Sequence, residues 1–193
     1  MPRKIIGLMG AIGSGKDTIA DFLVANGFTR LAFAKKVKDV AHVVFGWDRE
    51  LLEGRTAESR VWREQVDPVW GIRPRTALQK IGTEMFREHI CDDVWIKAVL
   101  EEIRATDRDV VITDCRFENE MAAILVAGGT LLFVQRGGEP AWAAAAATGA
   151  PFDPTLGVHV TDWNIYALRP MANRTIENNG TLEELYKKVS ESV

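Results

Sequence analysis

Residues 5–18 read Ile-Ile-Gly-Leu-Met-Gly-Ala-Ile-Gly-Ser-Gly-Lys-Asp-Thr, and the order of residue types in this stretch decides the fold. The first five are a continuous apolar run that stops at Gly10, which is typical of a strand buried on both faces of a parallel sheet. Apolar residues at positions 19, 22 and 23 follow at helical spacing. The stretch therefore predicts a strand, a glycine-rich turn and a helix in direct succession.

The glycine-rich turn has the composition of a phosphate-binding loop. Its glycines let the backbone wrap so that successive N–H groups point at phosphate oxygens, and the positive end of the next helix adds to the attraction. Lys16 supplies a mobile positive charge for the β and γ phosphates. The residues expected to bind the phosphates of ATP are Gly10, Gly13, Ser14, Gly15, Lys16, Asp17 and Thr18.

Asp17 departs from the common form of this loop, in which a Ser or Thr directly after the lysine ligates magnesium. The hydroxyl group arrives one residue later, at Thr18. A carboxylate at position 17 would hold Mg²⁺ through water or shape the acceptor site. The alternative is that Asp17 is an acidic residue that only suits the positive end of the helix.

A second carboxylate is expected at the same edge of the sheet. Residues 110–113 have the pattern of a short buried strand, and Asp114 follows directly. Because α/β sheets bind ligands at the carboxyl ends of their strands, we expect Asp114 to face the nucleotide and its metal, again through water. Arg116 has a guanidinium group that matches phosphate oxygens. The alternative is a purely structural pair of Asp114 with Arg116.

The rest of the chain alternates strand patterns with helical ones. Further strands are expected at residues 30–33, 131–134 and 174–176. Helices are expected at residues 37–45, 96–103, 121–125 and 182–189, the last with a capping box at residues 181–184. This alternation predicts a three-layer α/β/α fold of the P-loop NTPase type, around a mainly parallel sheet of about five strands.

The length of 193 residues fits a single domain, residues 1–193, because a chain of this size buries one good core. Two segments interrupt the alternation of strands and helices. Residues 47–73 are rich in charge and tryptophan, and we expect an excursion on the acceptor side. Residues 137–157 hold an alanine run between glycines and prolines, and we expect a lid loop.

The composition argues against several classes of protein. The net charge is −3, and lysines and arginines are scattered among acids, which argues against nucleic acid as the ligand. Cys91 and Cys115 form no CxxC pair and are expected to be core thiols in a reducing compartment. Because no stretch approaches the ~18 apolar residues of a membrane span, a soluble, cytoplasmic protein is expected.

Several residues are candidates for the acceptor side of the site. Arg75 stands at the entrance of a helical pattern that includes Gln79, where it would hold a second phosphate; an ordinary surface position is the alternative. Arg136 follows the strand at residues 131–134 and is expected to reach the transferred phosphate as the lid closes. The tryptophans considered for stacking on a base, against the commoner role of core packing, are Trp62, Trp70 and Trp95.

Taken together, these motifs resemble the deoxynucleoside monophosphate kinases of tailed bacteriophages. The shared stretches occur in the same order along most of the chain. They are SGKDT at residues 14–18, Lys38-Asp39, Arg75 with QKIGTE at residues 79–84, Trp95 with Lys97, DCRFENE at residues 114–120, Gln135-Arg136, His159-Val-Thr-Asp162 and NNGTLEELYKKV at residues 178–189. Asp162 stands where the family usually has Glu, and residues 137–157 look longer than their counterpart.

The resemblance implies transfer of the γ-phosphoryl group of ATP to a deoxynucleoside monophosphate (dNMP), with Mg²⁺ required, and it implies a homodimer. The residues that it assigns to catalysis are Lys16, Asp17, Arg116 and Arg136. Those that it assigns to the acceptor are Lys38, Arg75, Gln79, Trp95, Asp114 and Arg116. The metal is assigned to Asp17 and Asp114.

Two other functions stay open from the sequence. The first is a small-molecule kinase acting on a phosphorylated metabolite such as phosphomevalonate or dephospho-coenzyme A, whose phosphate loop looks much the same. The second is a nucleotide-dependent switch or binding module, against which the absence of an NKxD element for reading guanine argues.

Overall fold

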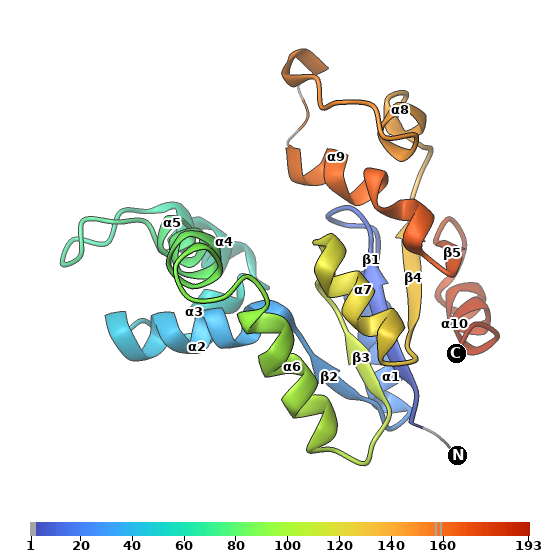
Figure 1. Cartoon of the computed structure of the whole chain (residues 1–193), viewed down its shortest axis with the longest axis horizontal. Helices are drawn as coiled ribbons and strands as arrows, with labels where there is room; N and C mark the ends of the chain where they lie inside the picture. The colour runs from blue at the N-terminus through green and yellow to red at the C-terminus, as the bar shows by residue number, and fades with distance from the viewer. Residues whose placement is uncertain (1–2, 157, 159) are drawn as a thin grey trace. The chain divides into compact units, whose positions relative to one another are not determined.

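The computed structural model describes residues 3–156, 158 and 160–193, apart from the side chain of residue 161, so His159 lies outside the described residues. The chain forms two compact units (Figure 1). The first comprises Met1–Ala32 and Glu102–Val193, and the second comprises Phe33–Glu101. Among the described helices, none combines the length and apolar character that crossing a bilayer requires.

Within the described residues, the first unit is built on a five-stranded parallel sheet in the order β2-β3-β1-β4-β5. The strands are β1 (Ile5–Met9), β2 (Thr29–Leu31), β3 (Val110–Ile112), β4 (Thr130–Gln135) and β5 (Arg174–Glu177). The central strand β1 pairs with β3 on one side and β4 on the other. The predicted parallel sheet is confirmed, although β2 ends early because Phe33 already begins a helix.

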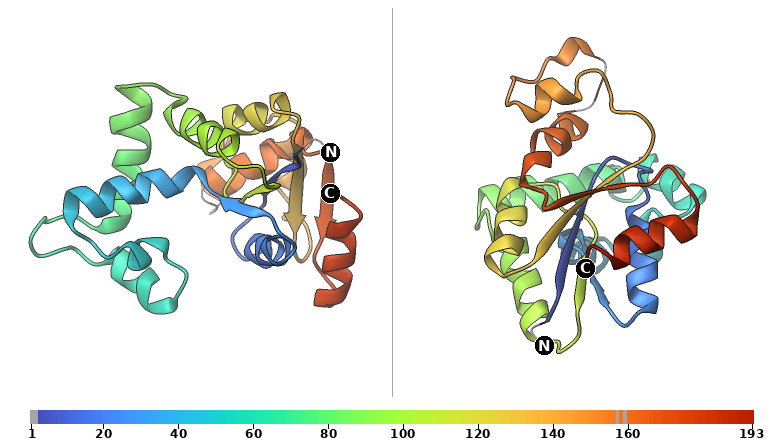
Figure 2. Two further views of the ribbon diagram at one scale, coloured as in Figure 1. Left: turned by 90° about the horizontal axis from the view of Figure 1, so that it is seen from below. Right: turned by 90° about the vertical axis from the view of Figure 1, so that its right-hand side faces the viewer.

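Helices cover both faces of this sheet, which confirms the three-layer fold (Figures 1 and 2). Helices α1 (Lys16–Ala25) and α10 (Leu182–Ser190) pack on one face, and α7 (Glu118–Val126) packs on the other. Alternate residues of each strand serve the two faces, so Ile6 and Leu8 join the core under α1 and α10. A Cβ at Gly7 would lie 2.9 Å from Ile124, so glycine permits the close approach of α7.

Between β4 and β5 the first unit carries a helical segment. Its elements are α8 (Ala143–Ala147), the 3₁₀ turn η2 (Pro154–Leu156), α9 (Val160–Ala167) and the 3₁₀ turn η3 (Arg169–Met171). The indole of Trp142, just before α8, stacks on Trp163 of α9 with ring centroids 5.6 Å apart. Residues 137–157, expected to be a loop, therefore contain two short helical elements.

The second unit is helical. Its elements are α2 (Phe33–Phe45), α3 (Arg49–Glu53), α4 (Ala57–Glu64), α5 (Pro74–Gln79), the π-helix η1 (Lys80–Glu88) and α6 (Val94–Arg104), whose end belongs to the first unit. Helices α3 and α4 lie in residues 47–73, where no helical period was apparent. They begin at polar caps, since Asp48 accepts a 2.7 Å hydrogen bond from the N–H of Glu50 and Thr56 forms a capping box with Ser59. Such short helices offer too few turns for an apolar stripe to be recognised.

Candidate active site

The loop between β1 and α1, residues 10–15, has a backbone path that requires glycine. Gly10, Gly13 and Gly15 have φ angles of +141°, +78° and +106°, which L side chains rarely adopt. A Cβ at Gly10 would lie 2.3 Å from the carbonyl oxygen of Val134, at the end of β4. We call residues 10–15 the phosphate loop, because its path brings the backbone to the carboxyl edge of the sheet, where α/β proteins bind ligands.

Lys16 lies against the phosphate loop. Its Nζ donates hydrogen bonds of 2.7 Å to the carbonyl oxygens of Gly10 and of Ala11. Burial lowers the pKa of Lys16 to about 8, and the nearby Arg116 adds to this effect, while Asp17 and Asp162 oppose it. These two carbonyl oxygens therefore hold the ammonium group at the loop. Phosphate oxygens are hydrogen-bond acceptors as well, so a bound phosphate can take the place of the carbonyls.

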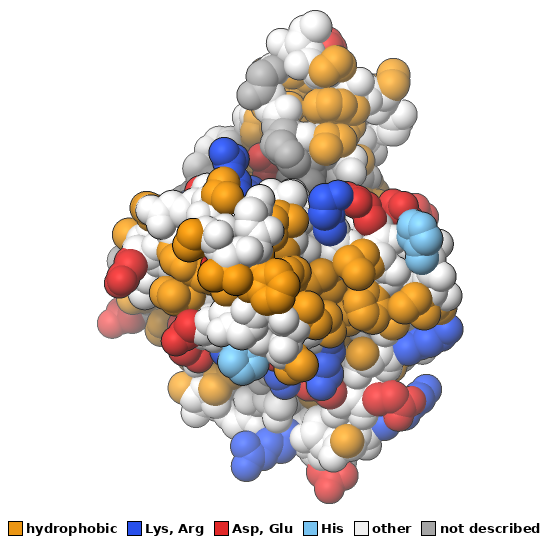
Figure 3. Space-filling view, turned by 90° about the vertical axis from the view of Figure 1, so that its left-hand side faces the viewer, with side chains coloured by type: hydrophobic (Ala, Val, Ile, Leu, Met, Phe, Trp, Pro, Cys, Tyr) orange, Lys and Arg blue, Asp and Glu red, His pale blue; other side chains and the backbone are white. Residues whose placement is uncertain are grey.

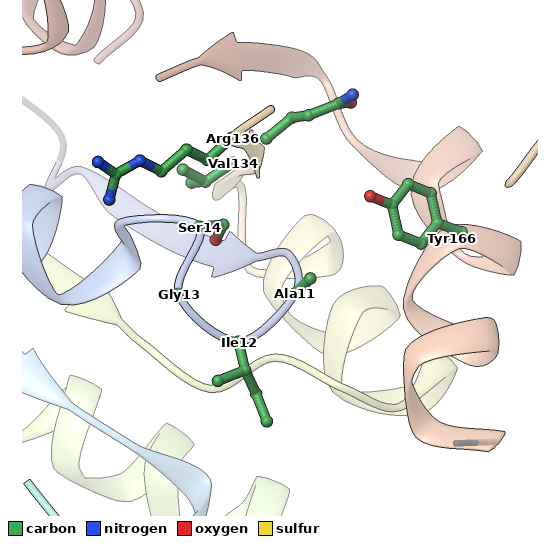
Figure 4. Close-up of a pocket in the computed structure, with 8 residues that line it drawn as sticks. Ala11, Ile12, Gly13, Ser14, Val134, Arg136 and Tyr166 are labelled. Atoms are coloured by element: carbon green, nitrogen blue, oxygen red, sulfur yellow. The ribbon is translucent and has the colours of Figure 1, made fainter. Parts of the chain in front are cut away.

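A small pocket of about 120 Å³ opens beside the phosphate loop (Figure 4). The residues that line it are Ala11, Ile12, Gly13, Ser14, Val134, Gln135, Arg136 and Tyr166. Sites that hold a whole small-molecule ligand are usually roughly 300–1,000 Å³ in volume, so this smaller pocket suits a phosphoryl group rather than a whole nucleotide. Arg136 is exposed, and no carboxylate of the described residues forms an ion pair with it.

The hydroxyl group of Ser14 is unsatisfied beside this pocket. Ser14 is only 4% exposed, and its Oγ has no hydrogen-bond partner among the described residues. Buried polar atoms without partners are rare in folded proteins and mark places where a ligand or water completes the structure. An orphaned hydroxyl, a glycine cradle and a lysine therefore fit the phosphates of a nucleoside triphosphate.

Asp17 does not line this pocket. Its carboxylate is exposed and forms an ion pair with Arg30, which also contacts Asp21 at 2.8 Å. Thr18, in the first turn of α1, is half-buried. The roles of Asp17 in catalysis and metal binding stay predictions, and sequence reasoning gave no sign that Arg30 would pair with it.

The chain segment after β3 carries Asp114 and Arg116, and a buried carboxylate holds its shape. Glu120 is 2% exposed and accepts hydrogen bonds of 2.9 Å from the N–H of Arg116 and 3.2 Å from that of Phe117. Asp114 is half-buried and Arg116 exposed. Glu120 was not among the predicted site residues, although a Glu three residues into a helix is a recognisable capping signal.

The oxygen donors near the loop suit Mg²⁺, which prefers carboxylate, hydroxyl and water ligands and retains several waters. Asp17, Thr18 and Asp114 supply donors of this kind. Within the described residues, no three His, Cys, Asp or Glu side chains gather closely enough to hold a metal by themselves. This donor set fits an ion held mainly through water and phosphate oxygens.

The other predicted acceptor residues belong to the second unit. Lys38 forms a 2.6 Å ion pair with Glu53, and Arg75 one of 2.7 Å with Glu64. Gln79 is the last residue of α5, directly before the π-helix.

The three candidate tryptophans of the second unit all make packing contacts. Trp95 is 5% exposed, and its Nε1 donates a 2.8 Å hydrogen bond to the carbonyl oxygen of Gly82 in the π-helix. Trp62 packs edge-on against Trp47, and Trp70 packs edge-on against Phe45. These contacts match the packing alternative stated for the tryptophans.

Comparison with known proteins agrees with this geometry. The family model described as deoxynucleotide monophosphate kinase matches residues 50–189. A protein of Acanthamoeba polyphaga mimivirus, named as a putative deoxynucleotide monophosphate kinase, is 29% identical over an alignment 199 positions long that covers 96% of this chain and 93% of that protein. The deoxynucleoside-5'-monophosphate kinase of Escherichia phage T5 is 29% identical over an alignment 173 positions long that covers 60% of this chain and 69% of that protein.

Among solved structures, dephospho-CoA kinase from Campylobacter jejuni superposes with a TM-score of 0.56 at 14% identity, covering 97% of this chain and 94% of that one. At this identity the likeness shows the fold alone, that of small-molecule P-loop kinases. The family match extends over more than half of the sequence and includes the segment after β3. The chain belongs to the deoxynucleotide monophosphate kinase family.

Proposed function

We propose that the protein transfers the γ-phosphoryl group of ATP to a deoxynucleoside 5'-monophosphate, giving the diphosphate and ADP, in the cytoplasm. The observation that carries the proposal is the phosphate loop. In this loop, the described hydrogen-bond partners of Lys16 are backbone carbonyl oxygens alone. Ser14 Oγ has no hydrogen-bond partner among the described residues. Membership of the kinase family supports a dNMP as the acceptor.

The proposed chemistry needs charge neutralisation and alignment rather than a strong base. A monophosphate acceptor is already largely ionised at neutral pH, so its oxygen attacks without losing a proton first. Lys16 leaves the carbonyls of Gly10 and Ala11 and binds the β and γ phosphates. Arg136, at the rim of the pocket, and Arg116, after β3, spread the negative charge of the transition state. Mg²⁺, held near Asp17 and Asp114, would add positive charge to the phosphates when bound.

We further propose that the two units serve as one kinase domain. The residues proposed for the acceptor are Lys38, Arg75, Gln79, Trp95, Asp114 and Arg116. Residues 47–73 serve the acceptor side and residues 137–157 form the lid. Support for these assignments comes from the residue types, because arginine and lysine match a second phosphate.

A homodimer is part of this proposal. The exposed large apolar side chains of the second unit include Val43, Val61, Val69, Trp70, Met85 and Ile90. Figure 3 shows one face of the molecule, on which hydrophobic side chains reach the surface. Exposed apolar surface of this kind is typical of contacts between proteins, and a second copy of the chain is the proposed partner. Light scattering at two protein concentrations measures the mass directly, and a monomer at both would exclude the dimer.

An ADP-release assay with ATP as the donor tests the reaction. The acceptor panel contains the four common dNMPs, methylated and hydroxymethylated dCMP, the ribonucleotides, dephospho-coenzyme A and phosphomevalonate. We expect turnover with at least one dNMP and little with the two metabolites. The Lys16→Ala variant controls for contaminating kinases and should be slower by several powers of ten. Turnover confined to a metabolite would replace the proposed acceptor.

A further inference from the structure

The pocket beside the phosphate loop has one wall that none of the sequence motifs predicted. This wall is Tyr166, on α9. Figure 4 shows its hydroxyl group directed toward the turn that contains Ala11, while Arg136 lies on another side of the same pocket. A residue from the segment between β4 and β5 thus meets the loop that follows β1.

The ring of Tyr166 is fixed by packing, so the fold determines the position of its hydroxyl group. Tyr166 is 6% exposed. Its ring packs edge-on against Phe133 of β4, with centroids 5.4 Å apart, and against Trp142, with centroids 5.1 Å apart. Aromatic contacts of this geometry hold a ring in one orientation.

The hydroxyl group of Tyr166 makes no hydrogen bond to a described residue. The residue as a whole is buried, but its hydroxyl group is not among the buried polar atoms that lack a partner, so a molecule in the pocket that Tyr166 lines can reach it. The same pocket is lined by Ser14, whose Oγ is also without a partner there. The accessible hydroxyl group of Tyr166 and the unpartnered Oγ of Ser14 line one pocket with Arg136, and Lys16 lies at the same loop. Hydrogen-bond donors and cations of this kind suit an anion with several oxygens.

Tyr166 is suited to donate rather than accept. Burial raises the pKa of Tyr166, and the carboxylates of Glu139 and Asp162 raise it further, against the opposing effect of Arg169. The phenol therefore stays protonated at neutral pH. A neutral O–H donor attracts phosphate oxygens, whereas a phenolate would repel them.

We propose that the hydroxyl group of Tyr166 donates a hydrogen bond to a phosphate oxygen of the bound nucleoside triphosphate. The inference rests on the proposed function, because it takes ATP as the occupant of the phosphate loop. It adds α9 to the elements that bind the donor. The contact is assigned to the phosphate tail rather than the base, because the pocket that Tyr166 lines lies against the phosphate loop.

The chain offers a matched control, because Tyr186 is its only other tyrosine. Tyr186 lies on α10, stacks on Phe22 with centroids 4.3 Å apart, and does not line the pocket. We expect Tyr166→Phe to raise the dissociation constant of ATP about tenfold, equivalent to about 1.4 kcal/mol, measured by calorimetry. Tyr186→Phe should leave it unchanged. Both variants should unfold within a few degrees of wild type, since each retains its ring contacts.

Inorganic tripolyphosphate distinguishes a phosphate contact from a general effect on the site. It carries phosphates without a base, so Tyr166→Phe should weaken its binding by the same factor as that of ATP. Adenosine binding should not change. An unchanged dissociation constant for ATP in Tyr166→Phe, or an equal loss for adenosine, overturns the inference while leaving the proposed function intact. If the wild-type protein does not bind ATP at all, the proposed function fails first.

Discussion

The side-chain amide of Asn178 donates a hydrogen bond of 2.9 Å to the carbonyl oxygen of Ser14, and the two residues are 164 positions apart. The bond ties the chain after β5 to the phosphate loop after β1. A Cβ at the next residue, Gly15, would lie 2.2 Å from the same Nδ2 atom. The shape of the loop therefore depends on Asn178 and on the lack of a side chain at position 15.

The first prediction concerns Gly15→Ala. The new methyl group must displace Asn178, and the residue must also keep a φ angle near +106°, so both the loop and its support are disturbed. We expect a loss of about 1–3 kcal/mol in the free energy of unfolding and a marked loss of ATP affinity. Gly13→Ala is the matched control for stability, because φ there is also positive but no atom lies within 4 Å of the place that a Cβ would take. Equal losses in the free energy of unfolding of the two variants would show that Asn178 is not the cause.

The second prediction concerns the pH dependence of ATP binding. The pKa of Lys16 is lowered to about 8 in the free protein, mainly by burial, and bound phosphates would raise it again. ATP therefore binds the protonated lysine, and binding above pH 8 requires proton uptake. The logarithm of the association constant should be level from pH 7 to 8 and should then fall, with a slope approaching about one per pH unit. Calorimetry in buffers of different ionisation enthalpy measures the proton uptake directly.

Arg116 provides the control for that pH profile. Its positive charge is the second cause that lowers the pKa of Lys16, after burial. Arg116→Gln should therefore raise this pKa and move the break in the profile to higher pH. A break at the same pH in both proteins would mean that another group titrates.

The third prediction separates acceptor from donor binding. Arg75 is exposed and pairs with Glu64, and a surface pair of this kind contributes at most about 1 kcal/mol to stability. Arg75→Ala should therefore leave the melting temperature nearly unchanged, raise the acceptor KM about tenfold or more, and leave the ATP dissociation constant as it is. Glu64→Gln removes the partner but keeps the arginine, so its acceptor KM should not rise. A rise in the ATP dissociation constant alone would contradict the assignment.

The sheet was predictable because its three middle strands, β3, β1 and β4, are runs of mainly apolar residues that are buried on both faces. Residues 5–9 and 131–134 have nothing but apolar residues and glycine, and such runs have few other structures open to them. The π-helix at residues 80–88 was not predictable, since no residue type or spacing rule used for the sequence separates it from an α-helix. The hydrogen bond that the indole of Trp95 donates to Gly82 of this helix is also not visible in the sequence.

Candidate site residues were predictable where they belong to one contiguous motif. They were not predictable where segments far apart in the sequence come together. Gly10 and Lys16 follow from a contiguous pattern. Tyr166 and Asn178 reach the loop only because parallel strands bring the ends of β1, β4 and β5 to one edge. The pairing of Asp17 with Arg30 depends on the path of the chain between α1 and β2, which no spacing rule specifies.

Lys38 has two possible roles, which are to bind the acceptor or only to stabilise the second unit. Lys38 and Arg49 both pair with Glu53, and the Lys38 and Glu53 side chains are 16% and 19% exposed. Burial alone would raise the pKa of Glu53, but the hydrogen bonds and charges of Lys38 and Arg49 lower it overall. The carboxylate therefore stabilises the fold above its ordinary pKa of 4.5, and this contribution is lost as the pH falls through the lower, folded-state value.

Two substitutions separate the roles. Glu53→Gln should lower the free energy of unfolding by about 1–3 kcal/mol at pH 7, with the difference from wild type shrinking in acid below pH 4.5. Because it leaves the Lys38 ammonium group in place, its acceptor KM should stay near that of wild type. Lys38→Met removes the ammonium group while Glu53 keeps Arg49, so a raised acceptor KM in Lys38→Met alone means that Lys38 binds the acceptor. If both variants lose stability and neither changes KM, Lys38 acts only within the fold.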